Sequence, residues 1–141
     1  MFYLLDTNVV SELRKSHKNM DARFRLWASS TDLNQCFLSV LSVLELEQGI
    51  QAKERSDPIQ GQVLRTWLQD YVLRVFKDRL VTINMPIACV AAGYHVPDPA
   101  PYYDALIAAS ASIYNYAVVT HNEKDFERFG IASINPWEFP D

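Results

Sequence analysis

Two acidic residues stand out because each interrupts apolar sequence. Asp6 ends the run Phe2-Tyr3-Leu4-Leu5 and is the only charged residue before Glu12. Asp104 is the only charged residue between positions 99 and 122, and it opens the small apolar run 105–109. Because burying an unpaired carboxylate is costly, such acids are expected to have partners. The alternative for Asp104 is a structural role, as the cap of a helix that begins there.

A further acid is expected in the middle of the chain, where Glu45 and Glu47 both interrupt the helix-forming run 41–52. Glu45 and Glu47 are two residues apart, which on a helix corresponds to a rotation of roughly 200° around the axis. Their two carboxylates therefore face different ways. The small residues Ser42 and Gly49 share the face of Glu45 and leave room for a ligand. Either acid could instead be an ordinary solvated glutamate, an interpretation preferred for Glu47, and periodicity does not choose between them.

Polar residues follow two of the predicted strands in similar positions. Thr7 and Asn8 come after the first strand, and Thr120 and Asn122 come after the fourth. The carboxyl ends of parallel strands meet at one edge of a sheet, where α/β proteins bind their ligands. Asp125 lies one helical turn beyond Asn122, and on its own it could be a surface residue.

Carboxylates gathered at one edge repel each other unless a cation holds them. Oxygen ligands suit Mg²⁺ or Mn²⁺ better than zinc. Mg²⁺ commonly binds one or two carboxylates together with substrate phosphates, which points to phosphate-ester chemistry. The sequence contains no glycine-rich phosphate loop, no paired Cys/His zinc spacing and no serine nucleophile elbow.

Strands and helices alternate along the chain, which predicts an α/β fold with a mostly parallel sheet of about five strands, covered on both faces. A single domain over residues 1–141 is expected from the length. The predicted strands are 2–6, 35–39, 80–83, 117–120 and 131–134. The predicted helices are 9–14 (capped by Asn8), 21–29, 41–52, 58–77, 86–93 (capped by Asn84 and ended by Gly93), 102–114 and 124–129.

The composition, 49% apolar and 21% charged, is typical of a soluble protein. No apolar run is long enough to span a bilayer, no leader is recognisable, and the two cysteines are isolated, so a cytoplasmic location is expected. The net charge is −4, but five basic residues face one acid between Arg14 and Arg25. This basic patch could attract a polyanion, or it could be a solvated loop and helix face.

Four motifs, in their order and spacing, resemble those of PIN-domain ribonucleases, specifically the toxin subunit of VapBC-type toxin–antitoxin pairs. They are Leu4-Leu5-Asp6-Thr7-Asn8, Leu44-Glu45-Leu46 with Gly49, Asp104-Ala105-Leu106-Ile107-Ala108-Ala109, and Val119-Thr120-His121-Asn122 with Asp125-Phe126. The ending Asn135-Pro136-Trp137 is similar to that of the FitB-like branch.

This resemblance implies a three-layer α/β/α sandwich and a Mg²⁺-dependent endoribonuclease that hydrolyses RNA as a type II toxin. It implies that Asp6, Glu45 and Asp104 correspond to the metal-binding acids of the family. The resemblance therefore selects Glu45 over Glu47. The supporting positions are Thr7, Asn8, Thr120 and Asp125, with Asn122 in the catalytic set. The implied partners are a small antitoxin and RNA, in a homodimer or a toxin–antitoxin hetero-oligomer, with no membrane.

The chain departs from the family pattern at two positions beside the fourth strand. Asn122 stands where the family often has aspartate, although many relatives combine Asn there with an acid at the position of Asp125. His121 stands where arginine is usual. Asn122 is the feature that favours the alternative, a non-cleaving PIN-like module that binds RNA or a partner. A phosphatase with Asp6 as nucleophile is disfavoured, because its pattern needs a second aspartate where Asn8 lies.

Overall fold

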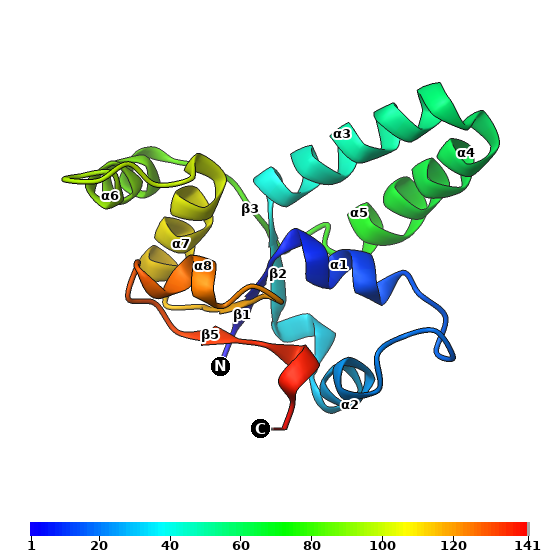
Figure 1. Cartoon of the computed structure of the whole chain (residues 1–141), viewed down its shortest axis with the longest axis horizontal. Helices are drawn as coiled ribbons and strands as arrows, with labels where there is room; N and C mark the ends of the chain where they lie inside the picture. The colour runs from blue at the N-terminus through cyan, green and yellow to red at the C-terminus, as the bar shows by residue number, and fades with distance from the viewer. Residues whose placement is uncertain (141) are drawn as a thin grey trace.

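The centre of the molecule is a parallel five-stranded sheet with the strand order β3-β2-β1-β4-β5 (Figure 1). The structure is a computed structural model that describes residues 1–140. Its strands are short: β1 (Tyr3–Leu5), β2 (Cys36–Ser39), β3 (Leu80–Val81), β4 (Ala117–Val119) and β5 (Ser133–Ile134). All four neighbouring pairs are parallel, so the carboxyl ends of the strands share one edge.

Helices connect the strands and form the two outer layers. The main helices are α1 (Thr7–Leu13), α2 (Ala22–Ser30), α3 (Val40–Ser56), α4 (Pro58–Trp67), α6 (Met85–Tyr94), α7 (Tyr102–Tyr114) and α8 (Lys124–Glu127). Helix α4 continues through the π-helical turn η2 (Leu68–Val72) into α5 (Leu73–Val75). The 3₁₀ turns are η1 (Leu33–Gln35) and η3 (Pro136–Glu138). None of the helices within residues 1–140 is long and apolar enough to cross a membrane.

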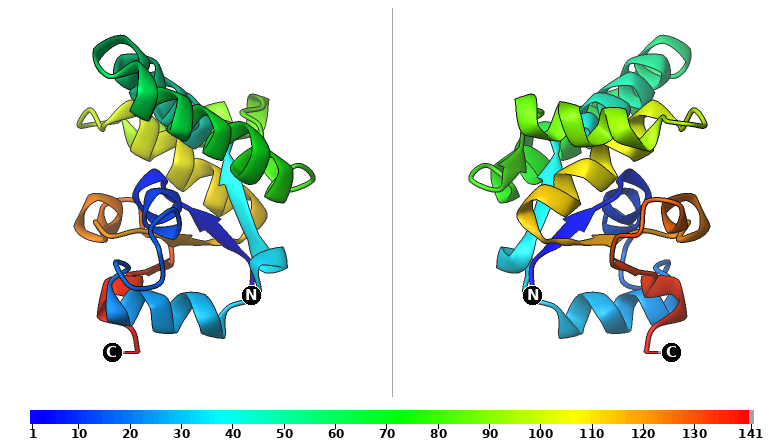
Figure 2. Two further views of the ribbon diagram at one scale, coloured as in Figure 1. Left: turned by 90° about the vertical axis from the view of Figure 1, so that its right-hand side faces the viewer. Right: turned by 90° about the vertical axis from the view of Figure 1, so that its left-hand side faces the viewer.

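Two hydrophobic cores lie on opposite faces of the sheet because successive strand residues point to opposite sides. Leu4 packs with buried residues of α6 and α7, such as Ile87 and Ile107. Leu5 packs into the other core, which α1, α2, α3 and η2 complete. The two side views in Figure 2 show helices on both sides of the sheet. The predicted three-layer α/β/α sandwich is confirmed.

The register of the sheet brings two polar residues together at its carboxyl edge. Leu5 of β1 pairs with Val119 of β4. One residue further on, the backbone N–H of Asp6 still donates to the Val119 carbonyl at 2.9 Å. Asp6 and Thr120 therefore leave neighbouring strands at the same level.

Helices α3 and α4 form an antiparallel hairpin that extends away from the sheet (Figure 1). The Asp57 side chain accepts from the backbone N–H of Gln60, with Pro58 at the first helical position. Arg65 of α4 makes ion pairs with Glu47 at 2.6 Å and with Glu54 at 2.9 Å, both on α3. Glu47 is therefore engaged in fixing the hairpin and is not simply solvated.

Several local predictions were wrong. Asp6, and not Asn8, caps α1, because its carboxylate reaches the backbone N–H of Thr7. Gly93 lies inside α6, which ends at Tyr94, and the capping residue His95 has an ordinary right-handed conformation that needs no glycine. Asp104 does not cap α7: the helix begins after Pro101, and Asp104 lies within its first turn without a capping hydrogen bond. The strands are also shorter than predicted, since the ladders of β3 and β5 cover two residues each.

Candidate active site

Asp6 is held rigidly at the carboxyl edge of the sheet. Its Oδ1 accepts a hydrogen bond from the backbone N–H of Thr7 at 2.8 Å. Its Oδ2 accepts from the hydroxyl of Thr120 at 2.8 Å and from the side-chain amide of Asn8 at 3.3 Å. These three donors come from α1 and from the residue after β4, so the carboxylate has a defined orientation. Burial raises the pKa of Asp6, the three hydrogen bonds lower it in part, and the charge of Asp125 raises it again.

Glu45 is tied to the same corner by a residue next to Asp6. The Thr7 hydroxyl donates to Glu45 Oε1 at 2.8 Å, which joins the start of α1 to α3. Glu45 is half-buried, whereas Glu47 turns toward Arg65 on the hairpin. The helical offset between the two glutamates thus sends one carboxylate toward Asp6 and the other away from it.

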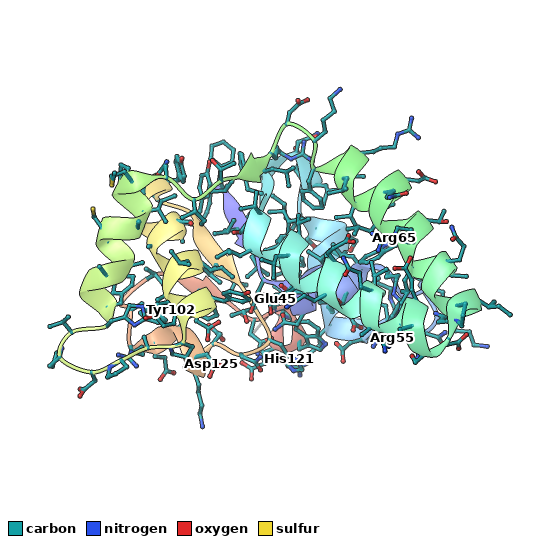
Figure 3. All side chains as sticks on the ribbon, turned by 90° about the horizontal axis from the view of Figure 1, so that it is seen from above. Glu45, Arg55, Arg65, Tyr102, His121 and Asp125 are labelled. Carbon is teal, nitrogen blue, oxygen red and sulfur yellow. The ribbon has the colours of Figure 1, made fainter. Side chains whose placement is uncertain are left out.

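Asp104 enters the site from α7, on the opposite side of the sheet from α1. No hydrogen bond to its carboxylate is found within residues 1–140. Its pKa is raised to about 6, first by burial and then by the negative charges of Asp6, Asp125 and Glu45. The carboxylates of these four residues, Asp6, Glu45, Asp104 and Asp125, form the acidic cluster. Figure 3 labels Glu45 and Asp125, which come from α3 and α8.

The segment after β4 places Asn122 and Asp125 beside the cluster. The backbone N–H of Asn122 donates to the Thr120 hydroxyl at 3.0 Å, and that of Asp125 donates to the Asn122 carbonyl at 3.0 Å. Thr120 is fully buried, but the side chains of Asn122 and Asp125 are exposed. The structure therefore brings Asp6, Glu45 and Asp104 to one edge with their polar neighbours, whereas Glu47 turns away to Arg65, and Asp125 supplies the fourth charge.

The acidic cluster suits a hard divalent cation in donor type and charge. None of its four carboxylates makes an ion pair in the part of the chain that the structure describes. In the same residues, no three His, Cys, Asp or Glu side chains come close enough together to hold a metal directly. Mg²⁺ usually keeps several waters and binds through one or two carboxylates, so its binding does not require three carboxylates in direct contact.

Two features next to the cluster were not predicted. Asn8 uses its amide oxygen to accept from the backbone N–H of His121 at 3.2 Å, which links the first turn of α1 to the loop after β4. The ring of His121 also stacks on Trp137. Trp137 was indicated only by the resemblance of the chain's ending, and nothing in the sequence indicated its contact with His121.

The fold and the acidic cluster together define an α/β domain that gathers carboxylates at the carboxyl edge of a parallel sheet. The model of the PIN domain matches residues 3–132, and the chain belongs to the PIN-domain family.

Individual proteins that are similar to this chain support this membership. Ribonuclease VapC14 of Mycobacterium tuberculosis is 43% identical over 76 residues, covering 54% of this chain and 72% of VapC14. Toxin FitB of Neisseria gonorrhoeae is 30% identical over 140 residues, covering 95% of this chain and 97% of FitB. The crystal structure of FitAcB from Neisseria gonorrhoeae superposes with a TM-score of 0.88 at 27% identity, over 98% of this chain and 100% of the other.

Proposed function

We propose that this protein is a divalent-metal-dependent endoribonuclease that acts as the toxin of a type II toxin–antitoxin pair. The observation that carries the proposal is the acidic cluster: burial and the charges of the other three carboxylates raise the pKa of Asp104, and no member of the cluster has a cationic partner within residues 1–140. Relatives named a ribonuclease and a toxin support the choice of RNA and of the toxin role. The single PIN domain over residues 1–141 is the catalytic unit in this proposal.

Asp6, Glu45 and Asp104 are the proposed ligands of Mg²⁺, or of Mn²⁺, directly or through water. When bound, the ion would polarise a phosphoryl oxygen and promote attack by water, giving a 5′-phosphate and a 3′-hydroxyl. Asp125 adds negative charge to the cluster. Asn122 is uncharged and exposed, so it can orient a water or a phosphate oxygen without adding charge.

The protein's own hydrogen bonds keep this site in one arrangement. Thr120 and Asn8 fix one oxygen of Asp6, and the backbone of Thr7 fixes the other. The Thr7 hydroxyl holds Glu45 beside them. Fixed ligands lose little freedom when metal and substrate bind, which is the benefit of such preorganisation.

An acidic site must admit a polyanion, and the basic patch of residues 14–25 is proposed to hold the flanking RNA backbone. Lys15 is neutralised by Glu12 at 2.9 Å, but Arg14, Lys18 and Arg23 make no ion pair among the described residues. The seven-residue helix α1, roughly 10 Å long, separates the patch from Asp6. RNA binding should therefore weaken steeply with salt.

The proposed partner is a small antitoxin whose inhibitory segment places a basic side chain against the acidic cluster, in place of the metal. A homodimer or a toxin–antitoxin hetero-oligomer is the expected assembly. The cytoplasm is the proposed location, where Cys36 and Cys89 would stay reduced, as the free thiols here.

Asp6→Asn tests the assignment. The purified, antitoxin-free protein should cut single-stranded RNA with added Mg²⁺, and Asp6→Asn should lower the rate at least 100-fold with an unchanged circular-dichroism spectrum. Asp70, an exposed acid of the π-helical turn η2, provides the matched control, and Asp70→Asn should behave as wild type. Full activity of Asp6→Asn would contradict the assignment.

Asn122 supports a second candidate function, a PIN-like module that binds RNA or a partner without cutting. It leaves the corner next to Asp125 with an amide where an acid would strengthen metal binding. Retained RNA or antitoxin binding, without cleavage by the wild-type protein in Mg²⁺ or Mn²⁺, would establish this function instead.

A further inference from the structure

His121 and Trp137 form an aromatic platform at the edge of the site, defined here as these two rings. The rings are nearly parallel, with centroids 4.1 Å apart and an angle of 12° between their planes. His121 is an exposed residue although Trp137 covers one face of its ring. A histidine that served only the hydrophobic core would be buried.

Contacts on several sides hold the platform in place. Phe24 of α2 packs against Trp137 with ring centroids 4.8 Å apart. The Trp137 backbone N–H donates to the Asn135 side chain at 2.9 Å, and the Asn135 amide donates to the His121 carbonyl at 3.3 Å. Both residues are thus fixed before any ligand arrives, which lowers the entropic cost of stacking on them.

The platform is connected to the acidic cluster through one residue. The His121 backbone N–H donates to the Asn8 amide oxygen at 3.2 Å, and the amide nitrogen of Asn8 donates to Asp6 Oδ2 at 3.3 Å. His121 is also the direct neighbour of Asn122, and Figure 3 labels it together with Glu45 and Asp125. A group stacked on His121 therefore lies beside the proposed reaction site.

An open hollow of about 470 Å³ borders the platform, a size within the usual range for ligand pockets. Its lining combines His121 with Asn122, Lys124 and Asn135, and with the carboxylates Glu123, Asp125, Glu127 and Glu138. Four carboxylates against one lysine repel a phosphate group. An uncharged planar group with hydrogen-bonding edges suits both the lining and the stacked ring.

We propose that the ring face of His121 opposite Trp137 stacks a nucleobase of the RNA substrate next to the scissile phosphate. The inference rests on the proposed function and adds a positioning residue to it. Proteins hold single-stranded RNA in this way, by stacking unpaired bases on aromatic side chains, histidine included, and by hydrogen bonds to the base edges. The hollow's amides and carboxylates provide such hydrogen-bonding groups.

His121→Ala tests the platform cleanly, because His121 contacts Asn8 and Asn135 through its backbone and the substitution removes only the ring. We expect KM for a single-stranded RNA oligonucleotide to rise about 10-fold, the order found for one lost base stack, with little change in kcat. His121→Phe should restore KM. Tyr114→Ala is the matched control, since Tyr114 is an exposed ring stacked on Tyr116 at the opposite end of the sheet.

A measurement of RNA binding tests this inference separately from the proposed function. Fluorescence anisotropy with labelled single-stranded RNA, on the Asp6→Asn background, should give about 10-fold weaker binding when one particular base is replaced by an abasic site. The added His121→Ala change should abolish that sensitivity. If wild type cuts no RNA but this pattern holds, the nuclease proposal fails and the platform stands. An unchanged KM and affinity for His121→Ala, or His121→Phe behaving as His121→Ala, would overturn the platform.

Discussion

The Thr7 hydroxyl donates to Glu45 Oε1 at 2.8 Å, across 38 positions of sequence, while the backbone N–H of the same threonine donates to Asp6. One small residue thus sets the positions of two of the proposed metal ligands. It also ties the first turn of α1 to α3, two helices that lie on the same face of the sheet.

Removing that hydroxyl should affect activity more than stability. Thr7→Val keeps the shape and the backbone contact to Asp6, but leaves Glu45 free to turn. We expect cleavage to fall about 10-fold, corresponding to roughly 1.4 kcal/mol, and stability to fall by about 1 kcal/mol, the usual cost of one hydrogen bond. Thr7→Ser should keep most of the activity. Initial rates and urea denaturation measure both effects, and equal rates for Thr7→Val and wild type would show that Glu45 needs no anchor.

Isolation in apolar sequence was enough to single out Asp6 and Asp104, because few charges interrupt the strands and helices of a buried parallel sheet. Glu45 could not be separated from Glu47 in this way. The contacts that distinguish them, with Thr7 and with Arg65, join residues far apart in the chain. Asp125 acquires its neighbours only through the pairing of β1 with β4.

The alternation of strands and helices predicted the fold class correctly, whereas several element ends were missed. Helix α1 begins at Thr7 because the Asp6 side chain accepts a hydrogen bond from the first backbone N–H of the helix. Asp6, Thr7 and Asn8 are all suitable capping residues, so residue preferences alone do not decide which of them caps the helix. The role of His121 is a matter of tertiary contact: its stacking on Trp137 depends on where the chain's ending packs.

Asp104→Asn should stabilise the metal-free protein. The folded pKa of Asp104, about 6, lies above its ordinary value of 3.8, so the folded state binds a proton more tightly than the unfolded state does. Its ionisation therefore destabilises the fold above pH 6, and the penalty disappears as the pH falls through 6 toward 4. A shift of two units is worth roughly 3 kcal/mol, which partial exposure reduces to about 1 kcal/mol.

Urea denaturation in EDTA at pH 7.5 and pH 4.5 measures this effect. Wild type should gain stability relative to Asp104→Asn on acidification, and the two should converge at the lower pH. Asp70→Asn serves as the control, with no such difference. A variant less stable than wild type at pH 7.5 would show that Asp104 has a stabilising partner.

Addition of Mg²⁺ should reverse the order of these stabilities. A cation held by the acidic cluster relieves the mutual repulsion of the carboxylates, so at 100 times its dissociation constant it should add about 2.7 kcal/mol to wild type. Asp104→Asn should gain much less. Thermal denaturation in EDTA, Mg²⁺ and Mn²⁺, with Ca²⁺ as a size control, gives the comparison. The same shift in wild type and in Asp104→Asn would place the ion elsewhere.

The α3–α4 hairpin allows a matched pair of glycine substitutions that tests its close packing. A Cβ on Gly61 would lie 2.5 Å from Glu54 Cα, so Gly61→Ala must push the two helices apart. A Cβ on Gly49, in the middle of α3, would meet nothing within 4 Å. We expect Gly61→Ala to destabilise the protein by about 1–3 kcal/mol through overpacking, and Gly49→Ala to stabilise it by about 0.5–1 kcal/mol through helix propensity. Urea midpoints at a constant m-value would measure both, and a neutral Gly61→Ala would mean that the hairpin adjusts without loss.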